Sequence, residues 1–394
     1  MTYGHHFMYE PEPPRRRRGW IPVLIVFSIV AAAVGGWAVA SLGGDDAPRA
    51  AVETTVASTT TTGLSTTTTV SPSSTVAATD VVSEPTISTD TGGAVLVLDA
   101  SEVGDIVLGS VVTVQVSAGG GSGSGSGVVY DDSGHVITNH HVIEVGSTYQ
   151  VVLTDGRVYP ATLVGSDPVT DLAVLRIDAD GLVPVAVGST DLLDVGDPAI
   201  AAGSPLGLEG GPSLTVGVVS AFGRVVQTDA TTVLYGMLQT DAPITQGSSG
   251  GALVDAEGRL LGITTAVGVS SVGVEGVGFA TPVEIVVRVV EELLADGDAS
   301  ETFMGITGST AFAATGDGGE RPIGVEVQSV EPASPSEVAG LVSGDVVTAV
   351  GAVPVDTMPE LVALLRRHAA GDVVDMTIVS EGVTEIVTLV LASR

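Results

Sequence analysis

The stretch Q-T-D-A-P-I-T-Q-G-S-S-G-G-A-L-V-D-A-E-G-R-L-L-G, residues 239–262, places two serines in a glycine-rich turn before an apolar run. Glycine lets a backbone take positive φ and approach a ligand closely. Successive N–H groups in such a turn can converge on an anion. We therefore expect Ser249 to be a nucleophile and Gly247, Ser248 and Ser249 to form an oxyanion hole, with the N–H groups of Gly247 and Ser249 as donors. The alternative is a hairpin turn with two spare serines.

The composition narrows the possible partners and chemistry. The 394 residues carry 14 basic and 46 acidic side chains, a net charge of -32, and every basic residue is arginine. Such a surface argues against nucleic acid as a partner, because phosphate binding requires basic patches. The absence of cysteine excludes disulfides, thiolate catalysis and Cys-ligated zinc.

The N-terminal region predicts a membrane anchor. Residues 1–19 end in four arginines, and residues 20–42 carry no charge. This length is enough to cross a ~30 Å hydrocarbon core as a helix. The arginines should stay in the cytoplasm, so the rest of the chain should lie outside it. A cleaved signal peptide is the alternative, because Ala38-Val39-Ala40 resembles a cleavage site.

Residues 43–93 are rich in Thr and Ser and predict an unfolded tether. From Ala94 on, short β-branched runs are separated by Gly, Asp and Ser, which is typical of an all-β barrel or sandwich. Within this part, the pattern predicts a flexible loop for Gly119–Gly127. Thr281-Pro282-Val283-Glu284 is the first helix signal, with Thr281 as the cap. This helix should close a first domain, residues 94–298.

Residues 299–394 form a second unit with further β-branched runs and two helices. Ser334-Pro335-Ser336-Glu337 predicts a capped helix closed by Gly340. Residues 357–368 predict a helix with Leu361, Leu364 and Leu365 at helical spacing. His368 falls at its C-terminal end, where a cation is favourable, and we assign it no chemistry.

A nucleophilic serine needs a base and a carboxylate that orients it. In the β domain His135, His140 and His141 are the candidate bases, and His140-His141 follows an apolar strand in I-T-N-H-H-V-I. No Cys and no H-x-x-x-H accompany them, which disfavours a metal site. Asp171, at the mouth of the apolar run L-A-V-L-R-I, could accept a hydrogen bond from a histidine ring. The order His, Asp, Ser matches the triad of two-barrel serine proteases.

Several ordered segments carry a more specific resemblance. They are G-S-G-V-V-Y-D-D-S-G-H-V-I-T-N-H-H-V-I (125–143), T-D-L-A-V-L-R-I (170–177), V-G-D-P-A-I-A-A-G-S-P-L-G-L (195–208), T-V-G-V-V-S-A-F-G-R (215–224), the stretch 239–254 and G-V-G-F-A-T-P (276–282). The chain resembles an HtrA-type (Deg) serine protease. The resemblance implies a mainly β fold, a chymotrypsin-like double β-barrel followed by a PDZ domain.

By this resemblance His141 is the base, Asp171 the orienting carboxylate and Ser249 the nucleophile. The chain departs from the family where His140, Ser248 and Ala252 stand, at positions that usually hold Asn, Asn and Pro. The family's S1 pocket takes small aliphatic side chains, and residues 261–266 are expected to help line it. The resemblance implies no cofactor and no metal. It implies a homo-oligomer, a trimer or larger.

In the second unit Phe303-Met304-Gly305-Ile306 resembles the carboxylate-binding loop of PDZ domains. A peptide C-terminus would bind there and add as a strand beside the helix that carries Leu361 and Leu365. A structural unit without a ligand is the alternative.

The sequence thus predicts an anchored serine endopeptidase whose protease and PDZ domains face the extracytoplasmic space. It would act on misfolded or specific proteins and recruit or sense their C-termini. Two alternatives stay open: a chaperone or peptide-binding scaffold with an idle triad, and a regulatory protease that cuts one membrane partner.

Overall fold

The computed structural model describes residues 99–119, 121–205, 211–228, 232–265 and 276–394. These ranges belong to one compact unit, residues 90–394. Within them no helix is both long and apolar enough to span a membrane. The predicted segments 1–19, 20–42 and 43–93, and residues 94–98 at the start of the predicted first domain, lie outside the described residues.

Six antiparallel strands close into a first barrel, in the order β1-β2-β3-β6-β5-β4. They are β1 (Val111–Ala118), β2 (Gly121–Val129), β3 (His135–Thr138), β4 (Thr148–Val152), β5 (Val158–Asp167) and β6 (Leu172–Ile177). Along β1, Val112, Val114 and Val116 are buried in the barrel core, while Thr113 and Gln115 between them face outward. This alternation is the two-residue period of a strand with one face in a core.

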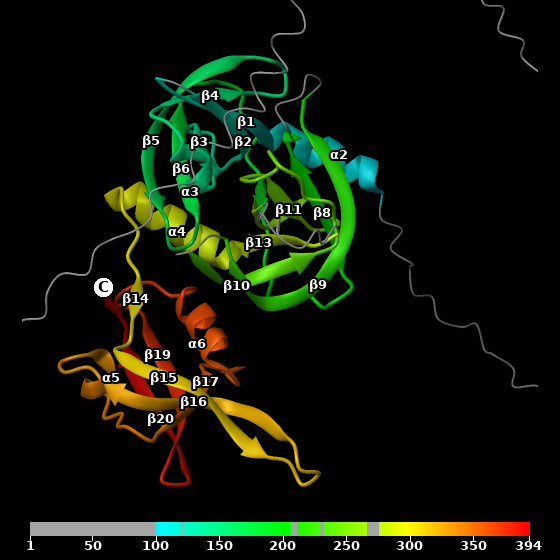
Figure 1. The fold of residues 1–394 in the computed structure, drawn as a ribbon. Coiled ribbons are helices and arrows are strands. Elements are labelled where there is room, and N and C mark those ends of the chain that lie inside the picture. Colours follow the sequence, from blue (N-terminus) through cyan, green and yellow to red (C-terminus); the bar gives the residue numbers. More distant parts are fainter. Residues whose placement is uncertain (1–98, 120, 206–210, 229–231, 266–275) are drawn as a thin grey trace, which may run out of the picture. The chain divides into compact units, whose positions relative to one another are not determined.

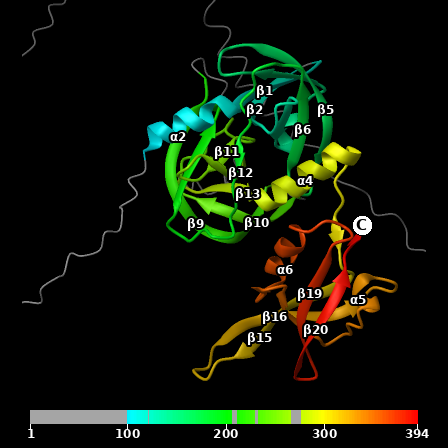
Figure 2. The same cartoon turned by 180° about the vertical axis from the view of Figure 1, so that it is seen from behind.

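Seven strands form a second sheet in the order β11-β8-β9-β10-β13-β12-β7, and the pairing of β11 with β12 closes all of them except the edge strand β7 into a second barrel. They are β7 (Ala186–Val187), β8 (Pro198–Gly203), β9 (Ser213–Gln227), β10 (Val233–Thr240), β11 (Ala252–Val254), β12 (Arg259–Thr265) and β13 (Gly278–Pro282). Helix α4 (Val283–Asp296) contacts β5 and β6 of the first barrel and β12 and β13 of the second, as Figures 1 and 2 show.

Among the residues that the structure describes, three shorter helical segments precede α4: α2 (Ala100–Val107), η1 (Leu108–Ser110) and α3 (His140–Ile143). The prediction that the first helix starts near Thr281 was therefore wrong. Thr281 pairs with Ile263 in β13 instead of capping a helix, and Pro282 is the N-cap of α4 without a side-chain hydrogen bond. Gly297 ends α4 in the left-handed conformation.

The predicted loop at 119–127 was also wrong, because most of it is strand β2. Two of its glycines, Gly125 and Gly127, fill places without room for a side chain. A Cβ added to Gly125 would lie 2.7 Å from a Val142 methyl, and one added to Gly127 would lie 2.7 Å from a Val136 methyl. Serine and glycine are poor strand formers in isolation. Pairing with β1 along its whole length holds this one in place.

The C-terminal unit is a six-stranded sheet in the order β15-β16-β17-β19-β20, with β18 paired to β17 off this path, and a second small pair β14–β21. The elements are β14 (Thr302–Phe303), β15 (Ile306–Ala314), β16 (Glu320–Val330), α5 (Pro335–Val338), β17 (Val346–Val350), β18 (Val353–Pro354), α6 (Met358–Leu365), β19 (Val373–Ser380), β20 (Val383–Val390) and β21 (Ala392–Ser393).

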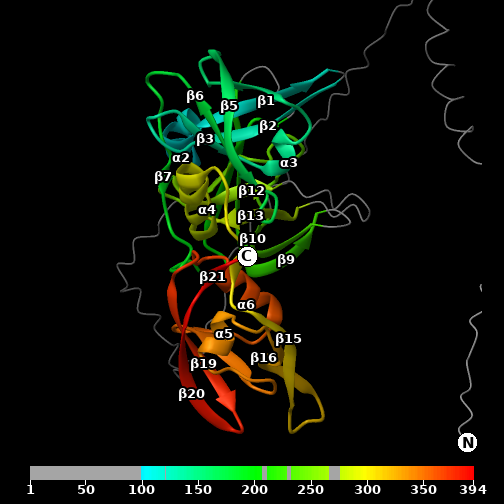
Figure 3. The same ribbon diagram turned by 90° about the vertical axis from the view of Figure 1, so that its left-hand side faces the viewer.

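Helix α6 contacts β15 and β16 (Figure 3). Thr357 and Glu360 form a complete capping box, and the helix ends at Leu365, earlier than predicted. At the start of α5 the Ser334 hydroxyl accepts a hydrogen bond from the Glu337 backbone N–H. The Glu337 carboxylate accepts from the Ala333 N–H rather than from the N-cap residue, so the capping box is incomplete.

Candidate active site

The turn that holds Ser249 is shaped by two glycines in the left-handed region, Gly247 at φ 91° and Gly250 at φ 86°. Gly250 also lacks space, since a Cβ there would lie 2.2 Å from the Ser126 carbonyl oxygen. The Ser248 N–H donates to the Thr245 carbonyl at 2.9 Å, so it is not a donor for an oxyanion. In the described part of the chain the Gly247 N–H has no acceptor, which leaves it available to a ligand.

Ser126, on β2 of the first barrel, holds the Ser249 turn in place through hydrogen bonds. Its N–H donates to the Ser249 carbonyl at 2.8 Å, and its hydroxyl donates to the Gly247 carbonyl at 2.7 Å. The same hydroxyl accepts from the Ser204 N–H at 2.7 Å. Sequence reasoning missed Ser126, although it lies in the quoted G-S-G segment immediately before an apolar strand.

The candidate base and its orienting carboxylate are in direct contact. Asp171 accepts from the His141 backbone N–H at 3.0 Å through Oδ1 and lies 2.7 Å from His141 Nδ1 through Oδ2. The Asp171 side chain is 8% exposed, whereas that of His141 is 41% exposed. A buried carboxylate on Nδ1 leaves Nε2 as the ring nitrogen that can exchange a proton with a substrate or a nucleophile.

Asp171 occupies the left-handed region at φ 58°, which is unusual for a residue with a Cβ. Two groups beside His141 hold it there. The Asn139 side-chain amide donates to the Asp171 carbonyl at 2.7 Å, and the His140 N–H donates to the same oxygen at 3.2 Å. Asn139 is fully buried, and its residue type gave no sign of this role.

The surroundings of His141 change its protonation. Burial of the ring favours the neutral form, but the hydrogen bond and negative charge of Asp171, with a smaller contribution from Glu144, outweigh it. The pKa of His141 is therefore raised above its ordinary value. A base with a raised pKa is a stronger proton acceptor from a serine hydroxyl.

The other two histidines have different partners. The His140 ring lies 3.1 Å from the Ser166 hydroxyl, and the His135 ring lies 2.6 Å from the Asp131 carboxylate. Of the three candidate bases only His141 has its ring against Asp171.

Strand β2 also brings the helix of the base close to the serine turn. A Cβ on Gly125 would meet Val142 of α3 on one side and the Ser249 carbonyl oxygen, at 3.2 Å, on the other. An activated serine, a histidine base and backbone donors are the groups needed for acyl transfer through a tetrahedral intermediate.

The expected S1 segment is only partly described. Leu261 is buried in the second barrel's core and Ile263 in the cluster that α4 shares with both barrels, and neither side chain is exposed to a substrate. Ala266 lies outside the described residues. Among the described residues, no group of three or more His, Asp or Glu could hold a metal ion.

In the C-terminal unit the predicted groove residues separate into two sets. Met304, Leu361 and Leu365 are buried in the core, while Phe303 and Ile306 are half-buried. Gly305, at φ 86°, forms the bend before β15. Among the described strands β15 pairs only with β16, so its other edge can accept an added strand beside α6.

Two family models match the chain: a trypsin-like peptidase domain over residues 125–263 and a PDZ domain over residues 326–380. The serine protease PepD of Mycobacterium tuberculosis is 33% identical over 386 residues, which cover 92% of this chain and 75% of PepD. The serine protease Do-like HtrA of Lactococcus lactis subsp. cremoris is 39% identical over 274 residues, covering 65% of this chain and 67% of that protein.

A probable periplasmic DegP-like serine endoprotease of Chlamydia trachomatis is 38% identical over 264 residues; the match covers 66% of this chain and about half of that protein, 52%. Among solved structures, an HtrA-type protease AlgW with a tripeptide gives a TM-score of 0.59 at 30% identity, over 75% of this chain and 97% of that one. A serine endoprotease from Yersinia pestis gives a TM-score of 0.53 at 32% identity, over 75% and 98%.

Proposed function

Because the chain belongs to the HtrA/DegP family of serine proteases, we propose that it hydrolyses peptide bonds with His141, Asp171 and Ser249 as its triad. The observation that carries these assignments is the paired contact of the buried Asp171 carboxylate with both the backbone and the ring of His141. That contact fixes the ring and favours the tautomer in which Nε2 can accept a proton.

In the proposed reaction His141 Nε2 takes the hydroxyl proton of Ser249 while the Ser249 oxygen forms a bond to the scissile carbonyl carbon. The negative charge that develops on the carbonyl oxygen is stabilised by the N–H groups of Gly247 and Ser249. His141 then gives the proton to the departing amine, and the carbon–nitrogen bond breaks. Water, deprotonated by the same ring, hydrolyses the acyl-enzyme and restores the Ser249 hydroxyl.

The C-terminal unit is proposed to bind the C-terminus of a polypeptide. The carboxylate would meet N–H groups of the segment Phe303–Ile306, and the peptide would add to the open edge of β15 beside α6. The burial of Met304, Leu361 and Leu365 supports a role in shaping this groove rather than in contacting the ligand.

The proposed location is outside the cytoplasm, with residues 20–42 as a single membrane anchor and 43–93 as a tether. The charge-free segment after Arg15–Arg18 supports this topology, and the periplasmic naming of the chlamydial relative is consistent with it. The proposed substrates are misfolded or specific extracytoplasmic proteins, and the proposed assembly is a homo-oligomer, a trimer or larger.

Labelling with a fluorophosphonate probe tests the triad. The full chain, purified in detergent, would be compared with Ser249→Ala and His141→Ala, each with and without a peptide carrying a free C-terminus. Labelling of the wild type that both substitutions abolish is the expected result. Labelling only with the peptide would identify a ligand-gated protease, and no labelling under either condition would favour the scaffold alternative.

A further inference from the structure

We propose that the groove next to Gly247 binds substrate side chains on the leaving-group side of the scissile bond. It would select uncharged side chains that both donate and accept hydrogen bonds, above all Gln and Asn. This inference rests on the proposed function, because it assigns a direction to the substrate across Ser249. Nothing in the triad itself demands such a selectivity.

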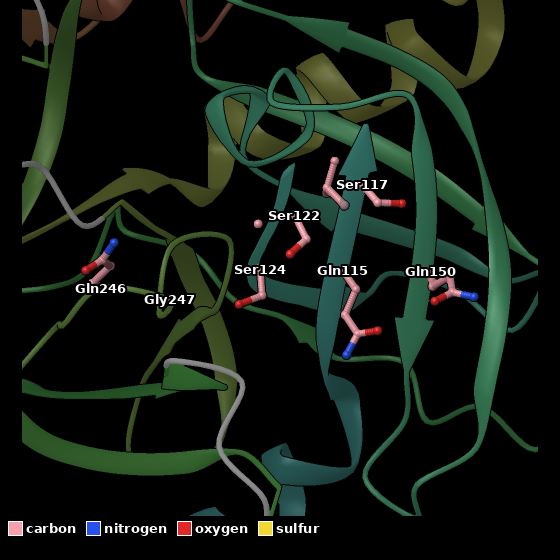
Figure 4. Close-up of a pocket in the computed structure, with 9 residues that line it drawn as sticks. Gln115, Ser117, Ser122, Ser124, Gln150, Gln246 and Gly247 are labelled. Atoms are coloured by element: carbon pink, nitrogen blue, oxygen red, sulfur yellow. The ribbon is translucent and has the colours of Figure 1, made fainter. Parts of the chain in front are cut away.

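The groove has a volume of about 690 Å³ and adjoins the oxyanion turn. One wall is Gln246–Gly247, and the other is the outer face of the first barrel (Figure 4). Because the Gly247 N–H is a proposed oxyanion donor, a peptide bound at Ser249 must pass the mouth of this groove within one or two residues.

The position of the base decides which half of the substrate passes the groove. The departing amine takes its proton from His141, so this half of the peptide leaves on the side of α3. Helix α3 packs on β2, where added Cβ atoms on Gly123 and Gly125 would meet Val145 and Val142. Strand β12 lies on the other side of the turn, where the Gly250 N–H donates to the Thr264 carbonyl. The leaving half therefore runs over β2 and along the groove.

The chemistry of the groove follows from the register of three strands. Gln115 on β1 pairs with Ser124 on β2 and with Gln150 on β4, so the three side chains form one row. All three are exposed, as are Ser122 and Gln246. Figure 4 shows Ser124 between the Gln246–Gly247 turn and the two glutamines. Each of these groups can both donate and accept, as the carboxamide of Gln or Asn can.

Every residue that lines the groove is uncharged, in a chain whose net charge is -32. A charged substrate side chain would find no counter-ion there, while an apolar one would remove these amides and hydroxyls from water without a partner. The serines of β2 repeat every second residue, about 6.7 Å apart. This is also the spacing of side chains on one face of an extended substrate.

The test uses internally quenched peptides in which each of the first three positions after the scissile bond carries Gln, Leu, Glu or Arg. We expect Gln over Leu by roughly three- to tenfold in kcat/KM at one of these positions, the effect of about one net hydrogen bond. In Gln115→Leu the ratio at that position should fall toward one. Gln328→Leu, on β16 of the C-terminal unit, is the matched control and should keep the ratio.

The readout is the ratio of kcat/KM for the Gln peptide to kcat/KM for the Leu peptide within one variant. A smaller fraction of folded protein lowers both values equally and leaves this ratio unchanged. Cleavage without a Gln preference at any of the three positions, or a preference that survives in Gln115→Leu, would overturn the inference alone. An Arg preference that salt abolishes would also overturn it, because it would assign selectivity to the acidic surface. If the wild type neither cleaves nor takes up the fluorophosphonate, the proposed function fails as well.

Discussion

Replacing Asp171 by Asn separates the charge of the orienting group from its shape. The Asn oxygen can still accept from the His141 backbone N–H, as Oδ1 does now at 3.0 Å. Its NH₂ group would then face His141 Nδ1, where Oδ2 now lies at 2.7 Å, and Nδ1 would have to become an acceptor. The ring proton moves to Nε2, which can no longer take the proton of Ser249.

We expect kcat/KM to fall by about 10⁴, as such a change of tautomer does in a serine protease triad, which corresponds to about 5 kcal/mol of transition-state stabilisation. The assay is the hydrolysis of a quenched peptide by the full chain between pH 5 and pH 10. Asp167→Asn is the control, because Asp167 is an equally buried carboxylate that bonds Val169 and Thr170 and not the histidine.

The pH dependence gives a second readout. His141 acts as a base only when neutral, so the wild-type rate should rise through the raised pKa of His141. Without the negative charge of Asp171 that pKa falls, and the rising limb should move to lower pH. The pair stabilises the fold below the unfolded pKa of His141, and this contribution is lost as the pH rises through the folded one.

The stability difference between wild type and Asp171→Asn should therefore be larger at pH 5.5 than at pH 8.5. A folded Asp171→Asn protein that loses less than tenfold in kcat/KM, or a similar loss in Asp167→Asn, would refute the assignment of Asp171.

Three further predictions concern the groups around the turn and the C-terminal unit. Ser126→Ala leaves the Gly247 carbonyl and the Ser204 N–H without their partner, so we expect a loss of about 1–3 kcal/mol in urea unfolding and a fall in kcat greater than any rise in KM; an unchanged kcat would contradict this. Gly125→Ala should displace α3 and lower kcat/KM, whereas Gly119→Ala, with nothing within 4 Å of its added Cβ, should match the wild type; equal activities would show that Val142 yields. Thr357→Ala removes the capping hydroxyl of α6 and should cost about 1 kcal/mol in thermal unfolding, and a loss below 0.3 kcal/mol would argue that Glu360 alone holds that helix end.

The strands could be predicted because short β-branched runs are separated by Gly, Asp and Ser, and β3 coincides with one of these runs. The errors arose where tertiary contacts outweigh local preference. Thr281 begins a capping sequence, but in the structure it lies in β13 and pairs with Ile263 of β12. Helix α2 was missed because its eight residues include a glycine, although the Asp99 side chain accepts from the N–H groups of Ser101 and Glu102.

The candidate site was predictable in its residue types and less so in its support. Spacing alone could not choose between His140 and His141. The two residues are adjacent in the short helix α3, and only the direction in which each side chain leaves that helix decides which ring meets Asp171. Ser126 and Asn139 left no chemical signal, since their importance comes from carbonyl groups that approach them from distant parts of the chain.

In β2 the Gly-Ser repeat has the same two-residue period as the strand, so the glycines lie on one face and the serines on the other. This limits the insertions and deletions that the segment can tolerate. Loss or gain of one codon inside the repeat would invert the faces and press hydroxymethyl groups against the helix that carries His141. Loss or gain of a whole Gly-Ser pair keeps every residue on its own face and changes only the reach of the hairpin. Length variants of this hairpin should therefore be tolerated in steps of two residues.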